Sequence, residues 1–153
     1  MKKYLSAVAF AAALAQPASA ITFSSLTTIY VGSGVFDDGQ GTHLGEATSI
    51  HCSNVSGVAV QVRALVLNVG GVAGSLTVNL QHGRTVTLST HQTAIFIEGD
   101  LNTGQVAQGV VNVEATNSAV FCTAIVVDAA NLTPIFMSPL HLVRVNPHPG
   151  TVE

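Results

Sequence analysis

Positive charge is nearly missing from this chain. Only 5 of its 153 residues are Lys or Arg, against 8 Asp or Glu, and Lys2 and Lys3 both lie at the N-terminus. Proteins that bind nucleic acid displace counterions from phosphates with clusters of Lys and Arg, and similar clusters hold proteins on anionic lipid. The sequence therefore predicts no nucleic-acid partner and argues against an electrostatic membrane anchor.

Tryptophan is absent, and tyrosine occurs only at Tyr4 and Tyr30. An aromatic platform for stacking sugars is therefore not evident. The chain also lacks the G-x-S-x-G motif of serine hydrolases, and no spacing pairs two carboxylates for glycosidase chemistry. We therefore expect no enzyme activity, no catalytic residues and no cofactor.

No apolar run reaches the roughly 18 residues of a membrane-spanning helix, but a shorter run follows the N-terminal lysines. Leu5 to Ala15 is apolar apart from one serine, Gln16-Pro17 interrupts it, and Ala18-Ser19-Ala20 supplies an A-x-A site. This layout is typical of a secretory signal peptide. We expect cleavage after Ala20 and a mature chain, residues 21–153, in the periplasm or outside the cell without a transmembrane segment.

Removal of residues 1–20 leaves 133 residues, enough for one domain with a hydrophobic core. Three arginines then face all eight acidic residues, a net charge of −5. Abundant Val, Thr, Ala and Gly with few charges indicate a compact β protein. We expect a single domain with a loose tail from about residue 146, because Pro147 and Pro149 cannot donate to a sheet ladder.

Apolar and polar residues alternate along many short segments. Val60, Val62 and Val66 share one face of their segment while Gln61 and Arg63 share the other, which is typical of a half-buried strand. Similar patterns predict strands at 22–31, 46–54, 58–68, 74–80, 84–90, 93–97, 107–115 and 119–128, with a ninth in 134–145.

Turn residues separate these segments. Gln81-His82-Gly83-Arg84 divides 74–80 from 84–90, and its glycine indicates a hairpin. Short strands at regular spacing, with no convincing helix after the signal, predict an antiparallel immunoglobulin-like β-sandwich of about seven to nine strands. A jelly roll or a small barrel is the alternative.

The only cysteines, Cys52 and Cys122, predict one disulfide, because exported chains are oxidised and a single intramolecular pairing exists. Alternation places Cys52 beside Ile50 and Cys122 beside Ala124 on inward faces. A bridge closing a loop of about 70 residues stabilises by about 4 kcal/mol in the chain-entropy model. We expect it to join an early strand to a late one across the sandwich, as in immunoglobulin domains.

His51 lies next to Cys52 but on the opposite, solvent-facing side of its strand. Blue-copper sites need a histidine and then a methionine soon after the cysteine, and neither cysteine has them. The histidines also show no local spacing for zinc or copper. We predict no metal site, and leave His43, His51 and His91 as candidate ligands should the fold gather them at one edge.

The strand containing Cys122 is apolar on both faces. Phe121, Ile125 and Val127 occupy the face opposite the cysteine, and a strand apolar on both faces must be covered twice. We expect the C-terminal run from Ile135 to Val145 to provide the second cover. A protein partner or self-association through this face is the alternative.

The segment from Ala47 to Ile97, which contains TSIHCSNVSG, a valine-rich strand and RTVTLSTHQTAIF, resembles a family of small uncharacterised exported bacterial proteins. The resemblance covers about a third of the chain. It implies a bacterial source and an exported, immunoglobulin-like β-sandwich. It brings no activity, so no functional residues follow from it.

These observations predict a non-enzymatic exported protein that acts by surface recognition or as a structural component. One alternative is a polymerising, pilus-like surface subunit, which needs an unpaired edge or a donor strand such as Ile21 to Val31. The other is a metal-binding module built from clustered histidines.

Overall fold

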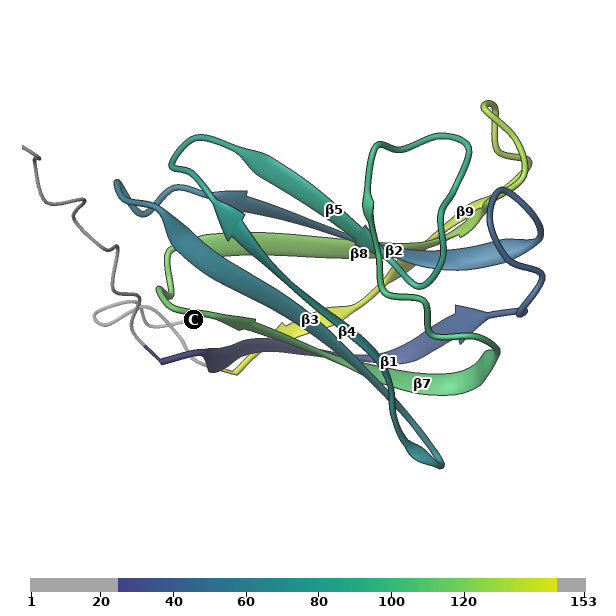
Figure 1. Ribbon diagram of the computed structural model, residues 1–153, viewed down its shortest axis with the longest axis horizontal. Coiled ribbons are helices and arrows are strands. Elements are labelled where there is room, and N and C mark those ends of the chain that lie inside the picture. Colours follow the sequence, from purple (N-terminus) through teal and green to yellow (C-terminus); the bar gives the residue numbers. More distant parts are fainter. Residues whose placement is uncertain (1–24, 146–153) are drawn as a thin grey trace, which may run out of the picture.

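The computed structural model describes residues 25–145 (Figure 1). The signal peptide 1–20, its cleavage after Ala20 and the tail from 146 lie outside these residues and stay predictions. Between residues 25 and 145 no helix is long and apolar enough to cross a membrane. Every regular element in this range is a strand, which confirms the all-β prediction.

Ten strands make up the described chain, against about seven to nine expected. They are β1 (Thr27–Asp37), β2 (Glu46–Asn54), β3 (Val60–Asn68), β4 (Gly71–Leu80), β5 (Thr85–Ser89), β6 (Gly99–Asp100), β7 (Val106–Ala115), β8 (Val120–Asp128), β9 (Met137–Leu140) and β10 (Leu142–Arg144).

The strands form two five-stranded sheets that pack face to face (Figure 1). The first sheet has the order β10-β1-β7-β3-β4, and the second has the order β6-β5-β2-β8-β9. All neighbouring strands are antiparallel except β5 and β6, which are parallel. The structure therefore confirms an antiparallel β-sandwich.

Alternation along the strands builds the core between the sheets. In β3, Val60, Val62 and Val66 are buried, while the intervening Gln61 and Arg63 are partly exposed, as the sequence predicted. Burial of an aliphatic side chain contributes about 1.5–3 kcal/mol. The core includes further fully buried side chains from both sheets, among them Ile29, Ile50, Leu88, Val111 and Val113.

Cys52 and Cys122 form the predicted disulfide. They are direct partners in the register of β2 and β8, so the bridge links neighbouring strands of one sheet. The expectation of a bridge across the sandwich is therefore wrong. Alternation placed both cysteines on inward faces correctly, since both are buried, but it does not say which sheet a strand joins.

The predicted hairpin between β4 and β5 is also wrong. These strands lie in different sheets, and the Gln81–Arg84 connection crosses between them. The Gly83 N–H donates to the Asn54 carbonyl at 2.8 Å and the Asn54 N–H donates to the Arg84 carbonyl at 3.0 Å, so the crossing is tied to the end of β2. The adjacent hairpin runs from β3 to β4 through Val69-Gly70.

The first strand is displaced from its expected position at 22–31. β1 continues to Asp37 because bulges on either side of Val35 keep it paired with β7 beyond the glycines at which the prediction stopped. β7 pairs along one side of β1, and β10 pairs with its other side at Tyr30–Gly32. Residues 27–31 of the proposed donor strand are therefore already built into a sheet.

The C-terminal run does not lie over the outer face of β8, and that expectation is wrong. β9 pairs with the edge of β8, and β10 pairs with the edge of β1, so the run extends both sheets and crosses between them at His141. Gly32 permits this crossing. A Cβ there would lie 2.6 Å from Cδ2 of Leu142 and 2.7 Å from Cδ2 of Leu140.

Connections gather at the two ends of the sandwich (Figure 1). We name one end the loop end, because it carries the β1–β2 loop (38–45), the β5–β6 loop (90–98) and the β8–β9 loop (129–136). The opposite end carries the β2–β3, β4–β5 and β7–β8 connections. The first and last described residues also lie there.

Candidate functional site

Backbone hydrogen bonds join the three loops of the loop end. The His43 N–H donates to the Gln92 carbonyl, which connects the β1–β2 and β5–β6 loops. The Ala129 N–H donates to the Gly45 carbonyl and the Ala94 N–H donates to the Ala129 carbonyl, each at 2.8 Å. The loops therefore form one connected surface although they come from distant parts of the chain.

Asp38 shapes the β1–β2 loop. Its Oδ1 accepts from the Gln40 N–H at 3.1 Å, and its Oδ2 accepts from the Glu46 N–H at 3.0 Å. Gly45 has φ 62°, and a Cβ there would collide with the Asp38 carboxylate, so only glycine fits. These bonds close the loop on itself.

Asp128 does the same for the β8–β9 loop. Its carboxylate accepts from the Ala130 N–H at 3.0 Å, the Asn131 side-chain amide at 2.8 Å and the Ile135 N–H at 3.0 Å. The bond from Ile135 and then that from Asn131 lower the pKa of Asp128, because they favour the charged carboxylate. This loop is thus held by an ionised side chain at the end of β8.

A buried ion pair lies beneath the loops. His91 Nδ1 is 2.8 Å from Oδ2 of Asp37, and His91 Nε2 is 2.9 Å from the carbonyl oxygen of Leu44. A neutral imidazole donates from one nitrogen only, so two acceptors favour the doubly protonated ring. Neither nitrogen is then free to take a proton from a nucleophile, which is the role of a catalytic histidine.

The pKa values of this pair agree with its geometry. Burial by itself would lower the pKa of His91, but the hydrogen bond and charge of Asp37 and the bond to Leu44 raise it overall. Burial opposes ionisation of Asp37, yet the hydrogen bonds from His91 and from the Gly39 N–H lower its pKa overall. Both groups are therefore stabilised in their charged forms.

The β5–β6 loop covers part of the outer face of the second sheet. The Ser89 hydroxyl and the Thr93 N–H both donate to the Glu98 carboxylate, which closes the loop. The Phe96 ring meets His51 edge to face, with ring centroids 4.7 Å apart. The strand predicted at 93–97 is therefore absent, because its backbone groups bond within loops.

The second apolar face of β8 is buried near the loop end and exposed near the opposite end. Val127, near the loop end, is fully buried, Ile125 is half-buried, and Phe121, near the opposite end, is 53% exposed. The Arg144 guanidinium lies 5.5 Å from the centroid of the exposed Phe121 ring. The face predicted for self-association is therefore only partly open.

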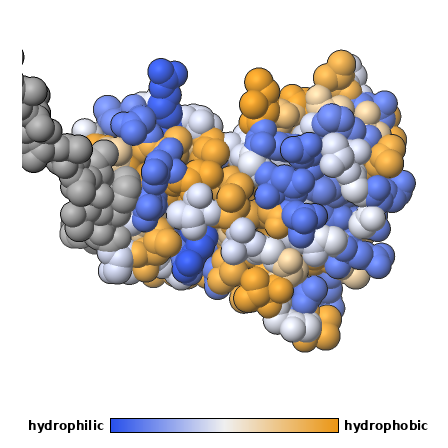
Figure 2. Space-filling view, in the orientation of Figure 1, coloured by the Kyte–Doolittle hydropathy of each residue, from blue (hydrophilic) through white to orange (hydrophobic). Residues whose placement is uncertain are grey.

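Aliphatic side chains project from the loop end into solvent. Ile97 is 102% exposed, Ile135 84%, Leu132 78% and Leu44 51%. Figure 2 shows apolar side chains standing out over the β5–β6 and β8–β9 loops. We call these four residues the loop-end surface. These four residues were not among the predicted site residues, although apolar residues within turn-rich segments were the available signal.

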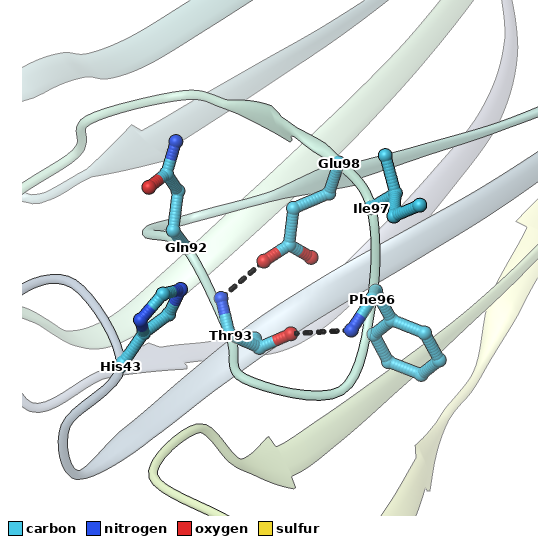
Figure 3. A pocket seen from close by; sticks show the side chains of 6 residues that line it. All are labelled: His43, Gln92, Thr93, Phe96, Ile97 and Glu98. Carbon is cyan, nitrogen blue, oxygen red and sulfur yellow. Dashed lines mark hydrogen bonds between the residues drawn. The ribbon is translucent and has the colours of Figure 1, made fainter. Parts of the chain in front are cut away.

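A pocket of about 240 Å³ opens between the β1–β2 and β5–β6 loops (Figure 3). Glu98 and Phe96 lie on one side of the pocket, and His43 approaches from the other. The complete lining consists of His43, Gln92, Thr93, Phe96, Ile97 and Glu98.

The three candidate metal ligands have separate environments. His43 lines the pocket, His91 pairs with Asp37, and His51 Nδ1 lies 3.0 Å from the Thr87 hydroxyl. Burial lowers the pKa of His51. Within residues 25–145 no group of three or more His, Cys, Asp or Glu side chains is arranged to hold a metal ion.

Comparison with protein-family models, with curated proteins and with solved structures finds no match for this chain.

Proposed function

We propose that this protein acts by recognising another protein through its loop end, without catalysing a reaction. The observation that carries the proposal is the loop-end surface. Soluble proteins rarely expose large aliphatic side chains together, and such groups usually mark interaction sites. In β-sandwiches, loops at one end of a rigid scaffold commonly carry recognition.

Preorganisation of these loops supports the proposal. Asp38, Asp128 and Glu98 each tie a loop by accepting hydrogen bonds from its own backbone or side chains. A loop that is ordered before binding loses less conformational entropy on contact with a partner. The exposed aliphatic groups are therefore presented in a nearly fixed arrangement.

We place this recognition in the periplasm or outside a bacterial cell. The N-terminal layout supports export, and the disulfide between Cys52 and Cys122 supports an oxidising compartment. The resemblance of residues 47–97 to small exported bacterial β-sandwich proteins is in line with this location.

Site-specific photo-crosslinking tests the proposal. A photoreactive residue at position 97 or 132, in the protein expressed in an exporting bacterium, should give a crosslinked partner of discrete mass. The matched control is position 58, because Val58 is 57% exposed but lies at the opposite end. Combining Leu132→Ser with Ile135→Ser should abolish the crosslink from position 97. Equal crosslinking from positions 58 and 97, or none from the loop end, would reject the proposal.

A further inference from the structure

The loop-end pocket has the size of one long side chain. Its volume of about 240 Å³ is below the roughly 300–1,000 Å³ of typical small-molecule pockets. The exposed Ile97 stands at its edge, so the pocket and the loop-end surface adjoin (Figure 3). A partner that covers Ile97 can therefore place a side chain in the pocket.

Glu98 gives the pocket a fixed negative charge. Its carboxylate accepts from the Ser89 hydroxyl and from the Thr93 N–H, which hold it in one position. Each carboxylate oxygen retains a second lone pair. The ion pairs within residues 25–145 join Arg63 to Glu114 and His91 to Asp37, so no cation there neutralises Glu98.

Apart from the His91–Asp37 ion pair, whose charges offset each other, the ionised side chains at the loop end are carboxylates. The carboxylates of Asp38 and Asp128 accept hydrogen bonds from their loops, and Glu46 lies at the start of β2 beside the β1–β2 loop. Described arginines lie elsewhere: Arg84 is in the β4–β5 connection at the opposite end, and Arg144 contacts Tyr30 and Ser118. The loop end thus attracts cations and repels anions.

We propose that the partner recognised by the loop end presents an arginine or lysine flanked by aliphatic residues, and that its cationic head enters this pocket. The head meets the Glu98 carboxylate, and the flanking residues pack on Ile97 and Leu44. Arginine fits best, because a planar guanidinium offers several N–H donors to a carboxylate. This inference rests on the proposed function and adds the chemistry of the partner.

Three synthetic peptides of equal length test the inference by calorimetry with the purified, disulfide-bonded protein. One alternates Leu with Arg, one alternates Leu with Glu, and one alternates Ser with Arg. The Leu/Arg peptide should bind most tightly, and its affinity should fall as salt is raised.

Two charge variants separate the pocket from the overall negative charge. Glu98→Gln keeps one oxygen that can accept from the Thr93 N–H, and its amide N–H can donate to the Ser89 hydroxyl oxygen. It should weaken Leu/Arg binding about tenfold, or about 1.4 kcal/mol. Glu114→Gln removes an equal charge far from the loop end and should leave the affinity unchanged. Should Glu98→Gln lower the unfolding midpoint, Phe96→Leu serves as the second variant and should weaken binding several-fold.

The other outcomes distinguish the inference from the proposed function. Equal binding of the Leu/Arg and Leu/Glu peptides, lost with Ile97→Ser, would retain the aliphatic recognition surface and overturn the cationic partner. Binding of the Ser/Arg peptide as tight as that of Leu/Arg, binding insensitive to Glu98→Gln and to Phe96→Leu, or no peptide binding would also overturn the inference. The proposed function is judged separately, by the crosslinking result.

Discussion

His91 donates a hydrogen bond from each ring nitrogen, to Oδ2 of Asp37 at 2.8 Å and to the Leu44 carbonyl oxygen at 2.9 Å. These contacts join the end of β1, the β1–β2 loop and the β5–β6 loop at a buried position. His91 is 6% exposed and Asp37 1% exposed. This pair therefore links three segments of the loop end, in addition to the hydrogen bonds accepted by Asp38, Glu98 and Asp128.

Stability should decrease as pH rises above neutrality. The folded pKa of His91 is raised above 6.5, so its contribution is complete below pH 6.5 and is lost as pH rises through the folded value. The effect of His51 on stability has the opposite sign, because its folded pKa is lowered and stability falls as pH decreases below 6.5. His51 therefore does not contribute to the decrease above pH 6.5. Urea unfolding at several pH values above 6.5 should show this decrease for the native protein and a flatter dependence for His91→Gln. An equal slope in both proteins would contradict the assignment.

Removal of the Asp37 carboxylate should be costly at neutral pH. Asp37→Asn leaves a buried imidazolium without its counter-ion, which costs roughly 3 kcal/mol. The Asp37 contribution is present above pH 3.8 and is lost as pH falls through its lowered folded pKa. Urea unfolding of Asp37→Asn at neutral pH and at pH 3 should therefore show a smaller deficit in acid. A deficit independent of pH would argue against the ion pair.

The disulfide should stabilise without determining the strand pairing. Cys52→Ala combined with Cys122→Ala should lower the free energy of unfolding by about 2–4 kcal/mol, because the unfolded chain without the cross-link gains conformational freedom. The far-ultraviolet circular dichroism should stay unchanged, because β2 and β8 remain paired along nine residue positions. Intact mass with and without reductant checks that the native bridge is present. Free thiols in the exported native protein would be incompatible with the structure.

Asp128 should control the order of the β8–β9 loop. Asp128→Ala removes the acceptor for Ala130, Asn131 and Ile135, so protease cleavage within 129–136 should become faster. Asp100→Ala is the control, since the Asp100 carboxylate accepts from the Asn102 N–H, outside this loop. Mass spectrometry of the fragments locates the cleavage. Identical cleavage in both variants would remove Asp128 from this role.

Gly32 should be essential to the crossing between the sheets. Gly32→Val places methyl groups against Leu140 and Leu142, and overpacking of this kind costs about 1–3 kcal/mol. Ser33→Val, at an exposed neighbouring position, should change the unfolding midpoint little. Equal destabilisation by the two substitutions would show that the close approach at Gly32 does not matter.

Two errors of sequence interpretation have one physical origin. The glycine turn after β4 reverses the chain in the same way whether the next strand pairs with β4 or joins the other sheet, so the hairpin prediction failed. Similarly, 93–97 has the composition of a strand, but the backbone N–H groups of Thr93 and Ala94 bond to Glu98 and Ala129. Both outcomes depend on residues distant in sequence, which local pattern does not specify.

The sequence by itself determined the strand faces and the identity of the disulfide, and it predicts export. Each depends on local order or on composition: alternation has period two, the N-terminal apolar run is continuous, and two cysteines allow one pairing. Only the tertiary structure decided the sheet order, the pairing of Asp37 with His91 across 54 positions, and the meeting of three loops at one end. These features arise from long-range packing, because many strand arrangements can bury the same apolar faces.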